Sequence, residues 1–173
     1  MPFFKFLFPL VSLLLNFGCS RNSEHIFIAD QLTEQTADQL KKEKGLSLIA
    51  IGGQMMGDIQ TMGVEFQYLQ LLNIEEARKM IIYTVHTYLK NINSNKKIRP
   101  YLHNYPFTIN NVRVAILVCQ PDGDSPSKGN IRHISISRGI LTYTLARPDK
   151  TSRMPILLEE TYAEALKIVE ENP

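Results

Sequence analysis

The sequence predicts an α+β domain in which helices cover one face of a mostly antiparallel sheet of about five strands. Three observations support this class. The chain of 173 residues has 44% hydrophobic and 21% charged residues, which is ordinary for a globular protein. Short apolar runs follow one another with only turn residues between them, and the clearest helical periodicity lies in the middle of the chain. The predicted order of elements is α-β-β-α-β-β-β-α.

The first predicted elements are a helix and two strands. A helix is expected over 30–44, because Asp30 can cap its first turn and Gly45 suits the left-handed position after its last turn. The continuous apolar run 46–51 predicts a buried strand, and a second strand is expected over about 58–69. The glycine-rich turn between them matches no phosphate-binding motif, so it indicates a backbone bend.

A long amphipathic helix is predicted next, and it is the strongest signal in the chain. Asn73 can cap this helix, with Glu76 completing a variant of the capping box. Behind the cap, apolar residues recur at steps of three and four: Ile74, Ala77, Ile81, Val85, Tyr88, Leu89 and Ile92. This periodicity predicts the central packing helix of the domain, which ends in the polar stretch 91–97.

The remaining predicted elements are three strands and a last helix. Apolar residues alternate along 107–119, which predicts a strand, and the turn residues of 120–129 predict a loop. Residues 131–136 and 140–145 are expected to be two strands joined by a tight turn. Pro155 is predicted to open the last helix, whose first turn carries two glutamates.

The amino-terminal residues have the pattern of an export signal. Lys5 and the α-amino group precede the almost wholly apolar stretch 6–17. This stretch is too short for a good membrane span, which needs about 20 apolar residues. Gly18 and Cys19 follow it directly.

The pair Gly18-Cys19 resembles the end of the lipobox in bacterial lipoprotein precursors. The resemblance covers only the amino-terminal segment. The class usually places Leu three residues before the cysteine and a small residue two before it, where this chain has Asn16 and Phe17. The alternative is that Cys19 is a chance cysteine in an uncleaved anchor or an ordinary signal peptide.

The resemblance implies a lipid anchor and a location. Residues 1–18 would be a signal peptide, Cys19 would carry acyl chains such as palmitate, and 19–29 would be a lipidated tether. A single α+β domain would then occupy 30–173. In this class, Ser20 after the cysteine implies the outer membrane of a bacterial cell envelope. Several acyl chains on one residue would hold the protein stably, since stable attachment takes at least two hydrophobic signals.

Charge and cysteine content argue against a nucleic-acid partner and against a disulfide bond. The net charge is +2, and about +1 without Lys5, so we expect no nucleic-acid partner, which would want a strongly basic face. If Cys19 carries lipid, Cys119 has no partner and no disulfide forms. Cys119 follows an apolar strand, so a buried core thiol is favoured over a reactive nucleophile.

No local motif for catalysis, a metal or a cofactor is present. The four histidines are His25, His86, His103 and His133, and no two of them stand at metal-ligand spacing. There is no nucleophile-elbow motif. An enzyme whose residues come together only in the fold leaves no local trace. The alternative function is therefore a hydrolase-like periplasmic enzyme that uses His86, His103 or His133.

One segment is predicted to be a binding surface. The segment 96–107 contains three basic residues, of which Arg99 is a candidate binding residue. The other candidates are Tyr101, His103 and Tyr105. Aromatic and cationic side chains in a loop are typical of recognition surfaces, because they bury much area at low entropic cost. The alternative is that the aromatic residues of this segment close the core while the lysines stay in water.

The leading hypothesis combines the anchor with this surface. We expect an exported, lipid-anchored envelope protein with a non-catalytic binding or structural role. Its partners would be the membrane, through the lipid, and a protein of the envelope. No cofactor is expected.

Overall fold

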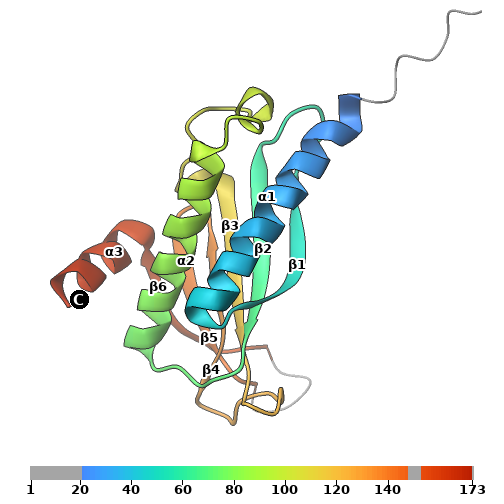
Figure 1. Ribbon diagram of the computed structural model, residues 1–173. Helices are drawn as coiled ribbons and strands as arrows, with labels where there is room; N and C mark the ends of the chain where they lie inside the picture. The colour runs from blue at the N-terminus through green and yellow to red at the C-terminus, as the bar shows by residue number, and fades with distance from the viewer. Residues whose placement is uncertain (1–20, 148–152, 173) are drawn as a thin grey trace, which may run out of the picture.

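Three α-helices pack against one face of a six-stranded sheet in the part of the chain that the structure describes (Figure 1). The structure is a computed structural model and describes residues 21–147 and 153–172. The helices are α1 (Arg21–Lys44), α2 (Ile74–Ser94) and α3 (Tyr162–Glu171). The strands are β1 (Ser47–Gln54), β2 (Thr61–Tyr68), β3 (Val112–Val118), β4 (Ile131–Ser137), β5 (Ile140–Leu145) and β6 (Ile156–Thr161).

The strands lie side by side in chain order, and this topology confirms the α+β class. Neighbouring strands are antiparallel except for β2 and β3, which are parallel. The parallel pair follows from the helix between them, since parallel neighbours need a crossover connection, here α2. The sheet has six strands, whereas about five were predicted, and the order of elements differs near the carboxyl end.

The central helix α2 begins where the sequence predicts. The Asn73 side chain accepts hydrogen bonds from the backbone N–H groups of Glu75 and Glu76, at 3.0 and 2.9 Å. The Glu76 carboxylate in turn accepts from the backbone N–H of Asn73 at 2.9 Å, which completes the capping box. The inward residues are fully or almost fully buried: Ala77, Ile81, Val85, Tyr88 and Ile92.

Helix α1 begins at Arg21, so most of the residues predicted as a tether are helical. His25 and Ala29 are 1% and 0% exposed. Further along, the buried hydroxyl groups of Thr33 and Tyr88 are 2.8 Å apart and join α1 to α2. Residues 21–29 therefore include packed positions of the domain, and Cys19 itself lies outside the described residues.

The prediction that Pro155 opens the last helix was wrong. Residues Ile156–Thr161 form strand β6, and the helix begins at Tyr162 with Thr161 as its cap. The two consecutive glutamates expected in a first helical turn lie on opposite faces of this strand. Glu160 points to the helix-covered face, where the Arg78 guanidinium binds it at 2.9 Å, so an acidic residue stands at an inward position. Because Glu160 is paired with a residue far away in the chain, the local sequence pattern did not indicate this strand.

The buried position predicted for Cys119 is confirmed. Its side chain lies at the end of β3 and is 1% exposed. The sulfur accepts hydrogen bonds from the Gln67 amide at 3.3 Å and from the Arg132 guanidinium at 3.2 Å. The thiol is therefore packed against its neighbours at this end of the sheet.

Candidate functional site

The predicted binding residues lie in the segment that follows α2, which includes a short 3-10 helix over Arg99–Tyr101. The Arg99 guanidinium stacks over the Tyr105 ring at 4.3 Å. The Tyr105 hydroxyl also donates a hydrogen bond to the backbone carbonyl of Asn93 at 3.2 Å. Arg99 and Tyr105 are both exposed, so this stacked pair presents a cationic and aromatic surface.

The other two predicted residues connect this segment to its neighbours. Tyr101 is half-buried and stacks on the His25 ring of α1, with 6.0 Å between the ring centroids. His103 contacts Asp58 in the connection between β1 and β2, at 2.6 Å. That hydrogen bond lowers the pKa of the Asp58 carboxyl. The four residues thus share one segment, but Tyr101 mainly holds it in place.

The histidines of the enzyme alternative lie in separate places. The His103–Asp58 pair is on open surface, with side chains 58% and 40% exposed. His86 lines a hollow at the far end of α2 together with Glu76. These two residues are ten positions apart on one helix, which separates them by about 15 Å along its axis. Neither histidine therefore has an acid beside it in an enclosed pocket.

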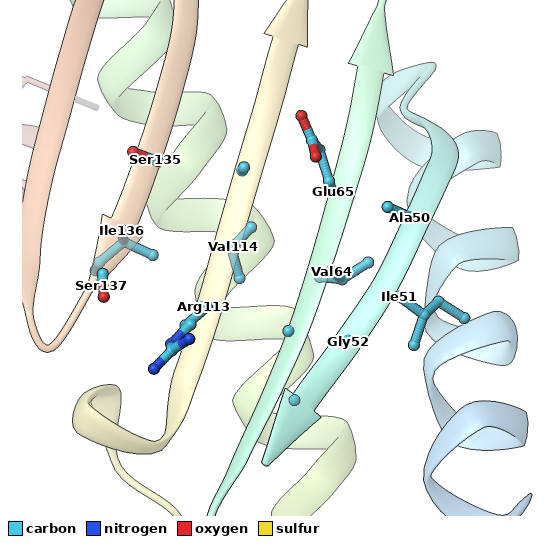
Figure 2. A pocket seen from close by; sticks show the side chains of 13 residues that line it. Ala50, Ile51, Gly52, Val64, Glu65, Arg113, Val114, Ser135, Ile136 and Ser137 are labelled. Atoms are coloured by element: carbon cyan, nitrogen blue, oxygen red, sulfur yellow. The ribbon is translucent and has the colours of Figure 1, made fainter. Parts of the chain in front are cut away.

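The open face of the sheet carries a hollow that the sequence analysis did not single out (Figure 2). It has a volume of about 380 Å³ and lies across β1 to β4, on the side away from the helices. Its floor consists of small residues that point away from the core: Ala50, Gly52, Gly63, Ala115, Ser135 and Ser137. A side-chain carbon added at Gly52 would have no neighbour within 4 Å.

Two charged residues of opposite sign bound this hollow. Figure 2 shows Glu65 on β2 and Arg113 on β3 at its opposite ends. Gly63, two residues before Glu65, is the strand partner of Arg113. Strand spacing and rise per residue therefore place the two Cα atoms about 8 Å apart. Within residues 21–147 and 153–172, Arg113 has no acidic partner within 4.0 Å. The hollow thus presents an unpaired cation and a carboxylate to solvent.

His133 completes the polar part of the open face. Its imidazole Nε2 lies 4.0 Å from the Glu65 carboxylate, diagonally across β3, the strand between them. Burial lowers the pKa of His133, and the Glu65 charge partly opposes this shift. The imidazole is therefore neutral at pH 7. The separation of 4.0 Å is too long for a hydrogen bond.

The signal for this site was present in the strand pattern. In β3 the inward residues are valine and isoleucine, whereas the outward residues are Arg113, Ala115 and Leu117. In β4 the outward residues are His133, Ser135 and Ser137. Only the register between strands, which no single segment reveals, places these polar and small residues next to Glu65 and Gly63.

Within the described ranges, no group of three or more histidine, cysteine or acidic residues is placed to hold a metal ion. None of the helices described there is long and apolar enough to cross a membrane. Comparison with protein-family models, curated proteins and solved structures found no match to this chain.

Proposed function

We propose that this chain is a lipid-anchored protein of a bacterial cell envelope, held at the outer membrane, whose domain binds a partner protein without catalysing a reaction. The observation that carries the binding role is the hollow on the open face of the sheet. Its small-residue floor admits a partner closely, and its unpaired Arg113 and Glu65 offer charges of both signs. Charges that meet opposite charges on a partner give specificity and register in protein interfaces.

The anchor is supported by the lipobox-like sequence that ends in Gly18 and Cys19. Arg21, the first residue that the structure describes, follows Cys19 by two positions in the sequence, and α1 is packed on the domain at His25 and Ala29. Acyl chains on Cys19 would therefore hold the domain directly at a membrane. Radiolabelled palmitate tests this, because we expect it to label the wild-type chain and not Cys19→Ala. Equal labelling of both would contradict the anchor.

The binding role is tested with a photo-reactive phenylalanine in place of Gly52, where the added side chain would enter open space. We expect this residue to cross-link a partner in intact cells. The same residue in place of Gln31, exposed on the outer side of α1, is the control and should give no cross-link. Arg113→Glu should abolish the Gly52 cross-link, whereas Arg113→Lys should retain it. A Gly52 cross-link of equal yield in the Arg113→Glu and Arg113→Lys chains would contradict the proposed surface.

A hydrolase is the second candidate, and His133 is the observation that favours it. This neutral imidazole shares a face with Glu65 and with Ser135, two residues further along β4. A nucleophile, a base and an acid are the groups that such chemistry needs. Hydrolysis of p-nitrophenyl acetate by the wild type, lost in both His133→Gln and Ser135→Ala, would support this candidate. The binding proposal expects the same background rate for all three proteins.

A further inference from the structure

A second surface lies at the end of the domain where α1 begins. Figure 1 shows that the start of α1, the β1–β2 connection and the segment after α2 lie at one end of the molecule. Contacts join them: His25 Nε2 lies 2.7 Å from the carbonyl oxygen of Met55, and the backbone N–H of Ile59 donates to the carbonyl of Tyr101 at 2.8 Å. We call this region the α1-start end.

This end exposes large apolar side chains. Met56, at the tip of the β1–β2 connection, is 95% exposed, and Phe27 is 66% exposed. Phe27 lies about 9 Å along the helix from Arg21, at 1.5 Å per residue. It does not point into the core, since the buried neighbours His25 and Ala29 occupy the inward side of these turns. Exposed apolar side chains at the same end of a domain as basic residues are typical of a surface that lies on a membrane.

The segment after α2 carries the charge that suits anionic lipid headgroups. Residues 91–111 contain no acidic residue and carry Lys96, Lys97 and Arg99, all exposed. The acidic neighbours are Asp58, which His103 already engages, Glu24 in α1, and Asp30 and Glu34 of α1, which line a hollow together with Met55. Each basic residue close to an anionic surface strengthens the contact about five-fold.

The short separation of Cys19 and Arg21 in the sequence indicates that a membrane would lie against this end. Two peptide units separate Cys19 from Arg21, so their Cα atoms lie within about 8 Å of each other. Acyl chains on Cys19 would therefore bring the α1-start end to the membrane surface before any other part of the domain. Helix α1 has 24 residues, which places its other end about 36 Å away.

We propose that the α1-start end lies on the membrane and contacts anionic headgroups through Lys96, Lys97 and Arg99, with Phe27 and Met56 entering the interfacial layer. This inference rests on the proposed lipid anchor. In this arrangement the predicted binding residues Arg99 and Tyr105 contact lipid. The open face of the sheet remains for the partner protein.

Fluorescence quenching tests the docking, because the chain has no tryptophan and a single one can report position. The full-length chain with Met56→Trp would be purified from bacterial membranes and reconstituted into vesicles. These contain phosphatidylcholine and phosphatidylglycerol with brominated acyl chains. Leu71→Trp is the control, since Leu71 is also exposed and lines the same hollow as Lys44, the last residue of α1. We expect strong quenching at position 56 and none at position 71.

The charges are tested with Lys96→Gln combined with Lys97→Gln in the Met56→Trp chain. Two lost basic residues should weaken the docking equilibrium about 25-fold. The matched control is Lys41→Gln with Lys42→Gln, which removes the same charge from the other end of α1 and should leave quenching unchanged.

Three outcomes would overturn the inference. Equal quenching at positions 56 and 71 in a protein whose mass shows the lipid would exclude docking and leave the anchor standing. A purified protein without lipid would overturn the anchor and the docking together. A photo-reactive residue at position 56 that cross-links a protein, with no quenching there, would assign this end to a protein partner.

Discussion

The two faces of the sheet are built from alternate residues of the same strands and differ completely in character. On the helix-covered face, β2 contributes Met62, Val64 and Phe66, each no more than 6% exposed. The intervening residues of β2 on the open face are Gly63, Glu65 and Gln67. The covered face supplies the apolar burial that drives folding. The open face buries less apolar area, because its residues on β2 are small, polar or charged.

The largest expected effect separates the two faces at adjacent residues of β3. Ile116 is 0% exposed on the covered face, so Ile116→Ala should lower the free energy of unfolding by about 4 kcal/mol through lost burial and a cavity. Leu117, half-buried on the open face, is the control, and Leu117→Ala should cost about 1 kcal/mol. Urea denaturation of both variants measures the difference. Equal losses would mean that the open face is packed against something in the folded protein.

A charge on the covered face gives the next largest effect. The Glu160 carboxylate accepts hydrogen bonds from Arg78 at 2.9 and 3.2 Å and from the Tyr143 hydroxyl at 2.8 Å. The pKa of Arg78 is raised by its hydrogen bonds to Glu160. The pKa of Tyr143 is raised mainly by burial and also by its hydrogen bond to Glu160. Glu160→Gln leaves a buried cation without its counter-charge and should cost about 3 kcal/mol.

Glu159 is the matched control for this pair, because it is the neighbouring residue of β6 on the opposite face and is exposed. Glu159→Gln should change the free energy of unfolding by less than about 0.5 kcal/mol. Thermal unfolding followed by circular dichroism measures both variants. A loss at position 159 as large as that at position 160 would refute the assigned orientation of β6.

Two adjacent glycines of β1 give a smaller contrast. A side-chain carbon at Gly53 would lie 2.3 Å from the backbone oxygen of Thr61, so Gly53→Ala should cost about 2 kcal/mol as the strands move apart. The same carbon at Gly52 meets nothing within 4 Å, so Gly52→Ala should be neutral or stabilise by about 0.5 kcal/mol. Denaturant midpoints of both variants test this contrast, and a costly Gly52→Ala would mean that the hollow is not open.

The smallest expected effect is a pH dependence from the open face. Burial lowers the pKa of His133 below its ordinary value of 6.5, so the unfolded chain takes up this proton more readily than the folded one. The stability from the neutral imidazole is therefore present above pH 6.5 and is lost as the pH falls through the folded pKa. His133→Gln should reduce this loss. Midpoints of urea unfolding between pH 7 and 5 measure it, and an identical pH profile in both proteins would contradict the shift.

Much of the fold could be predicted because its signals are local. The cap at Asn73, the periodicity of α2 and the alternation in β3 each act over a few residues, and all three were confirmed. Strand β6 could not be predicted, because Glu160 is stabilised by Arg78, 82 positions away in the chain. The predicted surface residues do share one segment. The hollow depends on strand register, which the sequence of one strand does not specify.

The lipid on Cys19 is the claim on which the anchor and the docking of the α1-start end both rest. Mass spectrometry of the full-length gene product, purified from bacterial membranes, tests it most directly. We expect a mature chain whose first residue is Cys19, with the added mass of its acyl chains on that residue. An unmodified Cys19 thiol, or a first residue at any other position, would contradict the account.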